Sequence, residues 1–303
     1  MKRHLSGRCQ VIGSCIMLAF ASFGAVRAEP APNPEKVSIP VHVGGKDFNM
    51  VAFVYQPPGS GPFPVIVFSH GRSPKVSERA GLDQPILAGH AGYWVKKGFA
   101  VLAPIRPGYG ETGGDDLEVS GIKISASGEC SGSPLYAQVA KNAADTIEAD
   151  VMWLRHQSWA NSKKIILVGQ SVGGLTTVAA GARHLSGVIA YINFSGGTGG
   201  DPERMPGRSC FPEALTALYG QLGRTTKLPN LWLYAQNDLF WGEAAPKLWH
   251  AAFSKAGGAG EFIETAAVPD EDGHKLLAKG GRLWSVHVDA FIETLGFVAA
   301  PHD

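Results

Sequence analysis

Short, nearly uninterrupted apolar runs recur along the chain, with enough residues between them for a helix. A run of four to eight such residues, bounded by glycine, proline or polar residues, is typical of a strand that is buried on both faces of a sheet. This pattern predicts strands at residues 65–68, 99–103, 165–168, 188–194 and 231–234. A sixth strand is predicted at 261–268, where apolar and polar residues are mixed.

Between these runs, apolar residues recur near every third or fourth position, which is the spacing of an amphipathic helix. The helices predicted are residues 86–97, 142–156, 175–184, 243–256 and 283–295. Strands that alternate with helices indicate an α/β fold with a mostly parallel sheet and right-handed crossovers. Residues 37–43 and 48–55 flank Gly44-Gly45 and predict an antiparallel hairpin at one edge of that sheet.

Two segments do not follow the alternation. Residues 109–136 are rich in Gly and Ser, and residues 196–227 contain a Gly-rich loop and one amphipathic helix. Both follow the carboxyl end of a predicted strand, which is where ligands bind in open α/β sheets. We therefore expect these segments to form pocket walls and a small cap.

The N-terminal residues have the features of a targeting signal. Lys2, Arg3 and Arg8 precede an apolar stretch at 11–23, and Val26-Arg27-Ala28 offers small residues for cleavage. The apolar stretch is too short for a spanning helix. We predict a signal peptide at 1–28, a Pro-rich leader at 29–36 and a single domain at 37–303, exported to the periplasm or secreted; an uncleaved anchor is the alternative.

Composition excludes some classes of function. With 45% hydrophobic and 17% charged residues, the chain can form a full core, and its net charge of +1 offers no field that would attract nucleic acid. The mature chain would retain two cysteines, Cys130 and Cys210, one in each irregular segment. In an exported protein we expect them to form a disulfide, with two buried thiols as the alternative.

The most informative motif is Gly169-Gln170-Ser171-Val172-Gly173, which stands between a predicted strand and a predicted helix. In that position a G-x-S-x-G motif predicts a nucleophile elbow, a turn so tight that side chains two positions from the serine would collide. Ser171 would then lie at the amino end of a helix, whose N–H groups favour developing negative charge.

A serine nucleophile needs a base, and the base needs an orienting carboxylate. Asp238 follows the predicted strand 231–234, and His274 lies on a loop after the last predicted strand. The order Ser171, Asp238, His274 is the one found in hydrolases that have an elbow. Asp272 is the alternative acid, because it lies two residues from the histidine.

The oxyanion of the intermediate needs donors. We expect them to be the main-chain N–H of Val172 and that of Arg72, which follows Gly71 after the strand 65–68. His70 precedes the elbow and is interpreted as a packing residue. No H-E-x-x-H or C-x-x-C motif and no phosphate-binding glycine motif occurs, so no metal or other cofactor is expected.

Four motifs in this order, Ser69-His70-Gly71-Arg72, the elbow, Gln236-Asn237-Asp238 and Asp272-Gly273-His274, resemble the α/β-hydrolase fold. Within it, residues 37–297 are most similar to exported members of the dienelactone hydrolase family. The resemblance implies an eight-stranded sheet with helices on both faces, no cofactor and hydrolysis of small esters. Many members of that family use a cysteine at the elbow, so Ser171 favours a general carboxylesterase.

Three other functions stay open. A peptidase of the prolyl-oligopeptidase type would use the same residues, although no propeller precedes the domain. An inactive hydrolase fold could serve as a binding protein, and the same triad could transfer an acyl group to an alcohol. The sequence does not indicate the preferred acyl group or the oligomeric state.

Overall fold

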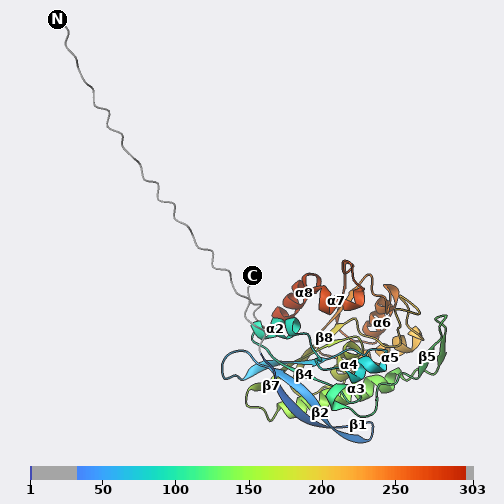
Figure 1. Ribbon diagram of the computed structural model, residues 1–303, viewed down its shortest axis with the longest axis horizontal. Helices are drawn as coiled ribbons and strands as arrows, with labels where there is room; N and C mark the ends of the chain where they lie inside the picture. Colours follow the sequence, from blue (N-terminus) through green and yellow to red (C-terminus); the bar gives the residue numbers. More distant parts are fainter. Residues whose placement is uncertain (2–32, 298–303) are drawn as a thin grey trace. The chain divides into compact units, whose positions relative to one another are not determined.

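An eight-stranded sheet organises the computed structural model, which describes Met1 and residues 33–297 (Figure 1). The strands lie in the order β1 (Glu35–Val43), β2 (Lys46–Tyr55), β4 (Ala100–Pro104), β3 (Phe63–Ser69), β7 (Ala160–Gln170), β8 (Val188–Phe194), β9 (Asn230–Ala235) and β10 (Glu261–Thr265). β2 is antiparallel to β1 and β4, and the other pairs are parallel. The predicted hairpin at one edge of a mostly parallel sheet is confirmed.

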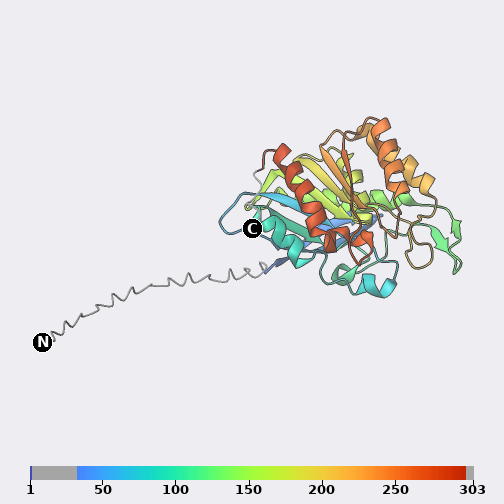
Figure 2. The same cartoon turned by 90° about the horizontal axis from the view of Figure 1, so that it is seen from above.

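Helices cover both faces of the sheet (Figure 2). The longer helices are α2 (Ala88–Lys96), α3 (Tyr136–Leu154), α4 (Val172–Gly181), α5 (Pro212–Thr225), α6 (Ala244–Lys255) and α8 (Gly281–Thr294), and the short ones are α1 (Val76–Ala80), α7 (Leu276–Lys279) and the 3₁₀ turns η1 (Gly110–Thr112) and η2 (Gly273–Lys275). One core lies between the sheet and α3, α4, α5 and α6, and the other lies under α2, α7 and α8. Apolar side chains on both faces of the central strands explain the apolar runs in the sequence.

Several boundaries differ from the prediction. β1 begins at Glu35, so the end of the proposed leader belongs to the sheet, and α3 begins at Tyr136 rather than residue 142. The segment 109–136 contains a small hairpin of β5 (Ile122–Ile124) and β6 (Cys130–Gly132). The amphipathic helix expected in a cap, α5, packs in the helical layer beside α6. The proposed signal peptide at 1–28 falls almost wholly outside the described residues.

The loops after β3, β7, β8, β9 and β10 meet at one edge of the sheet, because the carboxyl ends of parallel strands lie together. All the residues predicted for catalysis lie in these loops or at the start of the helices that follow. Within residues 33–297, no helix is long and apolar enough to cross a membrane.

Candidate active site

Ser171 occupies a sharp turn between β7 and α4. Its backbone angles are φ 57° and ψ −124°, and it directly precedes Val172, the first residue of α4. A positive φ is rare for a residue other than glycine and marks backbone strain. The N–H of Ser171 donates to the carbonyl of Phe194 at the end of β8, which helps to hold the turn. The geometry is that of the predicted nucleophile elbow.

The two glycines of the motif are required by close packing. A Cβ atom on Gly169 would lie 2.2 Å from the carbonyl oxygen of Gly173, and one on Gly173 would lie 1.9 Å from that of Ser69. Both distances are far below van der Waals contact, so any side chain would force the turn to open. The requirement for glycine two positions before and after the serine is thus confirmed.

Ser171 lines a cavity of about 220 Å³. Val172 and Arg72 contribute to it from the elbow side, and Thr198, Gly199 and Gly200 contribute from the loop after β8. The Gly-rich loop expected to form a pocket rim therefore lies at the cavity. Further lining residues are Arg79, Ile122, Ile124, Arg204, Phe240 and Trp241.

The charged side chains beside the cavity are paired. Arg72 and Arg79 both pair with the carboxylate of Asp116, and Arg204 pairs with Asp201. Lys75, in the same loop as Arg72, pairs with Glu78 and Glu203.

Asp238 and His274 form a buried pair. Nδ1 of His274 lies 3.0 Å from Oδ2 of Asp238, and the aspartate side chain is fully buried. Because a carboxylate can only accept, Nδ1 carries the hydrogen and Nε2 is left as the basic nitrogen. The other carboxylate oxygen accepts the main-chain N–H groups of Phe240 and Trp241, at 2.8 and 3.1 Å. These bonds fix the orientation of the carboxylate toward the ring.

The imidazole of His274 is held by neighbours on several sides. Phe240 stacks on it with ring centroids 4.0 Å apart, and Trp241 packs edge-on at 5.3 Å. The side-chain amide of Gln170 donates to the carbonyl of His274 at 2.9 Å, which ties the histidine to the elbow. Within residues 33–297, no hydrogen bond joins Ser171 to the ring. This bond is often long in hydrolases until substrate binds.

Asp272, the alternative acid, has a different task. Its Oδ1 accepts the main-chain N–H groups of Leu239 and His274, at 2.8 and 2.9 Å. It thus joins the loop after β9 to the turn η2. The geometry therefore favours Asp238 over Asp272 as the partner of the imidazole.

The two residues expected to donate to the oxyanion lie in segments that are next to Ser171. The N–H of Val172 is the first of α4 and so has no acceptor within the helix. A Cβ on Gly71 would lie 3.3 Å from Cβ of Ser171, so the loop that carries Arg72 passes directly beside the nucleophile. The side chain of Arg72 turns away to bind the carbonyl of Glu118 and the carboxylate of Asp116.

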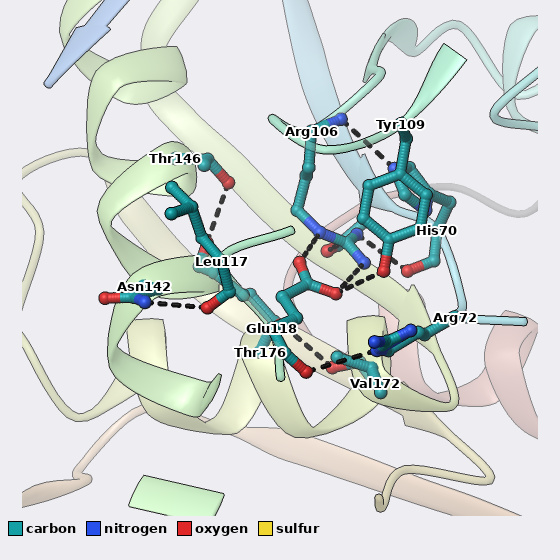
Figure 3. Close-up of polar contacts among 12 residues, drawn as sticks. His70, Arg72, Arg106, Tyr109, Leu117, Glu118, Asn142, Thr146, Val172 and Thr176 are labelled. Atoms are coloured by element: carbon teal, nitrogen blue, oxygen red, sulfur yellow. Dashed lines mark hydrogen bonds and ion pairs between the residues drawn. The ribbon is translucent and has the colours of Figure 1, made fainter. Parts of the chain in front are cut away.

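A buried polar cluster behind this loop was not predicted from the sequence (Figure 3). Arg106 and Glu118, each about 1–2% exposed, form an ion pair that also contacts Tyr109 and the main chain of His70. His70 itself is buried and packs in the loop, as interpreted. The sequence contained one sign of this cluster: Arg106 is a single charged residue in the apolar stretch that follows the predicted strand 99–103.

The β5–β6 hairpin forms the opposite wall. The structure joins Cys130 of β6 to Cys210 by a disulfide with 5.6 Å between the Cα atoms, which is the predicted pairing. Ile124 pairs directly with Cys130 across the hairpin, and its carbonyl accepts from Arg204 at 2.6 Å. Two irregular segments that are distant in the sequence therefore form one wall. In the described part of the chain, no three His, Cys, Asp or Glu side chains cluster so that they could hold a metal ion.

Solved structures with a similar fold are known, although their sequences differ widely from this one. No family model matches the sequence, and no curated protein matches it. Among solved structures, an esterase from Pyrococcus furiosus is similar with a TM-score of 0.57 and 12% identity over 86% of this chain and 91% of the esterase. A Klebsiella pneumoniae protein designated as a dienelactone hydrolase gives 0.52 and 16% over 88% of this chain and 98% of that protein.

The chain has the α/β-hydrolase fold. A puromycin-hydrolysing peptidase from Mycobacterium tuberculosis shares this α/β-hydrolase architecture, with a TM-score of 0.58 and 15% identity over 90% of this chain. The chain spans only 41% of that peptidase. In this fold, the elbow after β7 and the loops after β9 and β10 are where the nucleophile, the acid and the histidine are expected.

Proposed function

We propose that the protein is a serine hydrolase that cleaves carboxylic esters through an acyl-enzyme. The observation that carries the proposal is the hydrogen bond from Nδ1 of His274 to the buried Asp238, beside a serine held at positive φ. This arrangement leaves Nε2 as the base for Ser171. The disulfide supports an exported protein, since disulfides persist in oxidising compartments.

In the proposed reaction, Oγ of Ser171 attacks the carbonyl carbon while its proton passes to Nε2 of His274. The N–H groups of Val172 and Arg72 stabilise the oxyanion, and Asp238 stabilises the imidazolium. Collapse of the intermediate breaks the ester C–O bond, and the alcohol leaves with the proton from His274. Water then attacks the acyl-enzyme, with the same histidine as base, and the carboxylic acid is released.

One observation favours esters over peptides. The cavity of about 220 Å³ accommodates a short acyl group rather than an extended peptide. The similar peptidases make amide hydrolysis the second candidate.

A substrate panel tests the proposal. Esters of p-nitrophenol from acetate to palmitate are compared with aminoacyl-p-nitroanilides. We expect hydrolysis of the short esters, and loss of about 10⁶ in kcat for Ser171→Ala. Faster cleavage of the anilides would indicate a peptidase, ester products with an added alcohol would indicate acyl transfer, and no turnover of any substrate would indicate a binding protein.

A further inference from the structure

The main chain of the loop beside Ser171 is held by one buried arginine. Nη1 of Arg106 donates to the carbonyl of His70 at 2.7 Å and to the hydroxyl of Ser69 at 3.0 Å. The main-chain N–H of Arg106 donates to Nε2 of His70 at 3.1 Å. Arg106 therefore fixes both the backbone and the ring of His70, two residues before the expected donor Arg72.

These contacts determine the tautomer of His70. Because Nε2 accepts, Nδ1 carries the hydrogen and donates to the carbonyl of Gly71, 2.7 Å away. Burial, aided by the charge of Arg106, lowers the pKa of His70 to about 3, so the ring stays neutral near pH 7. The peptide that ends in the N–H of Arg72 begins with this carbonyl of Gly71. The orientation of that peptide is thus set by His70.

Glu118 holds Arg106 in place. Its carboxylate lies 2.5 Å from Nε and 3.2 Å from Nη2 of Arg106, and it accepts the hydroxyl of Tyr109 at 2.5 Å (Figure 3). Burial alone would raise the pKa of Glu118, but the charge and hydrogen bonds of Arg106 and the bond from Tyr109 lower it. The main-chain carbonyl of Glu118 also accepts from Nε of Arg72 at 3.1 Å. Glu118 therefore contacts both the anchoring arginine and Arg72.

Neither Arg106 nor Glu118 lines the cavity at Ser171, so neither can touch a substrate there. We propose that both are positioning residues, which aim the main-chain N–H of Arg72 at the oxyanion by fixing His70 and Gly71. The inference rests on the proposed ester hydrolysis. A correctly aimed donor acts on charge that develops in the transition state, so its loss lowers kcat more than it raises KM.

The test compares Arg106→Lys and Glu118→Gln with Asp289→Asn. Asp289 pairs with Lys97 in a second buried ion pair, neither member of which lines the cavity, and serves as the matched control for loss of stability. We expect the first two variants to lose about 10- to 1,000-fold in kcat, with KM within a few-fold, because removing an oxyanion donor outright costs about 10²–10³. Asp289→Asn should lower Tm and keep the wild-type kcat.

Inhibitors provide a readout that a purely structural role would not change. A boronic acid forms a tetrahedral adduct on Ser171, and its affinity should fall by the same factor as kcat/KM, whereas binding of the product carboxylate should not change. If Arg106→Lys does not fold, Tyr109→Phe removes one hydrogen bond to Glu118 and should give a smaller change with the same signature.

The inference is overturned if the variants keep their kcat, if KM alone changes, or if Asp289→Asn loses kcat to the same extent. Those results leave ester hydrolysis itself standing. If the wild-type protein neither hydrolyses esters nor forms an acyl-enzyme on Ser171, the proposed function fails and this inference fails with it.

Discussion

The two walls that flank Ser171 are held by opposite means. On the side of Gly71 and Arg72, the main chain is fixed by Arg106 and Glu118, which are almost completely removed from solvent. On the other side, the β5–β6 hairpin presents only partly buried or exposed residues and is fixed by a disulfide. A desolvated ion pair specifies one geometry and is costly to break, whereas a cross-link holds a wall that has little core of its own.

This contrast separates two tasks. The buried wall carries the group expected to stabilise the transition state, and the cross-linked wall contributes Ile122 and Ile124 to the surface of the cavity. We therefore expect changes in the first wall to act on kcat and changes in the second to act on KM.

Apart from loss of Ser171 itself, replacement of the acid should have the largest effect. Asp238→Asn keeps the shape of the side chain but no longer holds the required tautomer of His274, which costs about 10⁴ in kcat in comparable triads. Asp272→Asn keeps an amide oxygen that can accept the same main-chain N–H groups, and it should cost much less. Steady-state kinetics on a short ester measures both. A larger loss for Asp272→Asn would show that the wrong acid has been assigned.

Loss of the disulfide should act on the other wall. In Cys130→Ser/Cys210→Ser we expect KM to rise a few-fold and kcat to change little, because the catalytic residues lie outside the hairpin. The cross-link closes a loop with a sequence separation of 80. The free energy of unfolding should therefore fall by up to about 4 kcal/mol, as measured in urea. Unchanged KM and stability would show that the hairpin does not shape the pocket. A free-thiol count of two on the unfolded, unreduced mature protein, whose only cysteines are Cys130 and Cys210, would refute the link.

Asp150 is a buried carboxyl group whose pKa is shifted in the opposite direction to that of Glu118, because it lacks a direct partner within residues 33–297. Asp150 on α3 is fully buried, and neither of its carboxylate oxygens has a hydrogen-bond partner among the described residues. Burial raises the pKa of Asp150 well above its ordinary value, and the charge of Arg106 offsets this only in part. Glu118, which Arg106 contacts directly, shifts in the opposite direction.

A raised pKa in the folded state means that the unfolded chain loses its proton first. The group therefore destabilises the protein as pH rises above the ordinary pKa of an aspartate. We expect Asp150→Asn to be about 1–3 kcal/mol more stable than the wild type at pH 8 and nearly equal to it at pH 3, below the ordinary pKa of an aspartate. Urea unfolding at both values measures the difference. A gain that is the same at both would show that Asp150 does not titrate in this way.

The hydrophobic pattern predicted all eight strands of the sheet. The central strands are buried on both faces and apolar almost throughout, and the edge strands β1 and β2 alternate on either side of a glycine turn. It missed the first residues of β7, since 161–164 are polar and lie beyond the core. The triad candidates and the disulfide could be predicted because each has a recognisable position after a strand. Arg106 and Glu118 could not, because their burial arises only when two loops pack together.

If Ser171 is an activated nucleophile, it should react covalently with a fluorophosphonate. The wild-type protein is treated with a fluorophosphonate, and the intact mass and the modified peptide are determined. We predict one adduct per chain, on Ser171, and no adduct on Ser171→Ala. An adduct on another residue, or equal labelling of Ser171→Ala, would show that Ser171 is not the nucleophile.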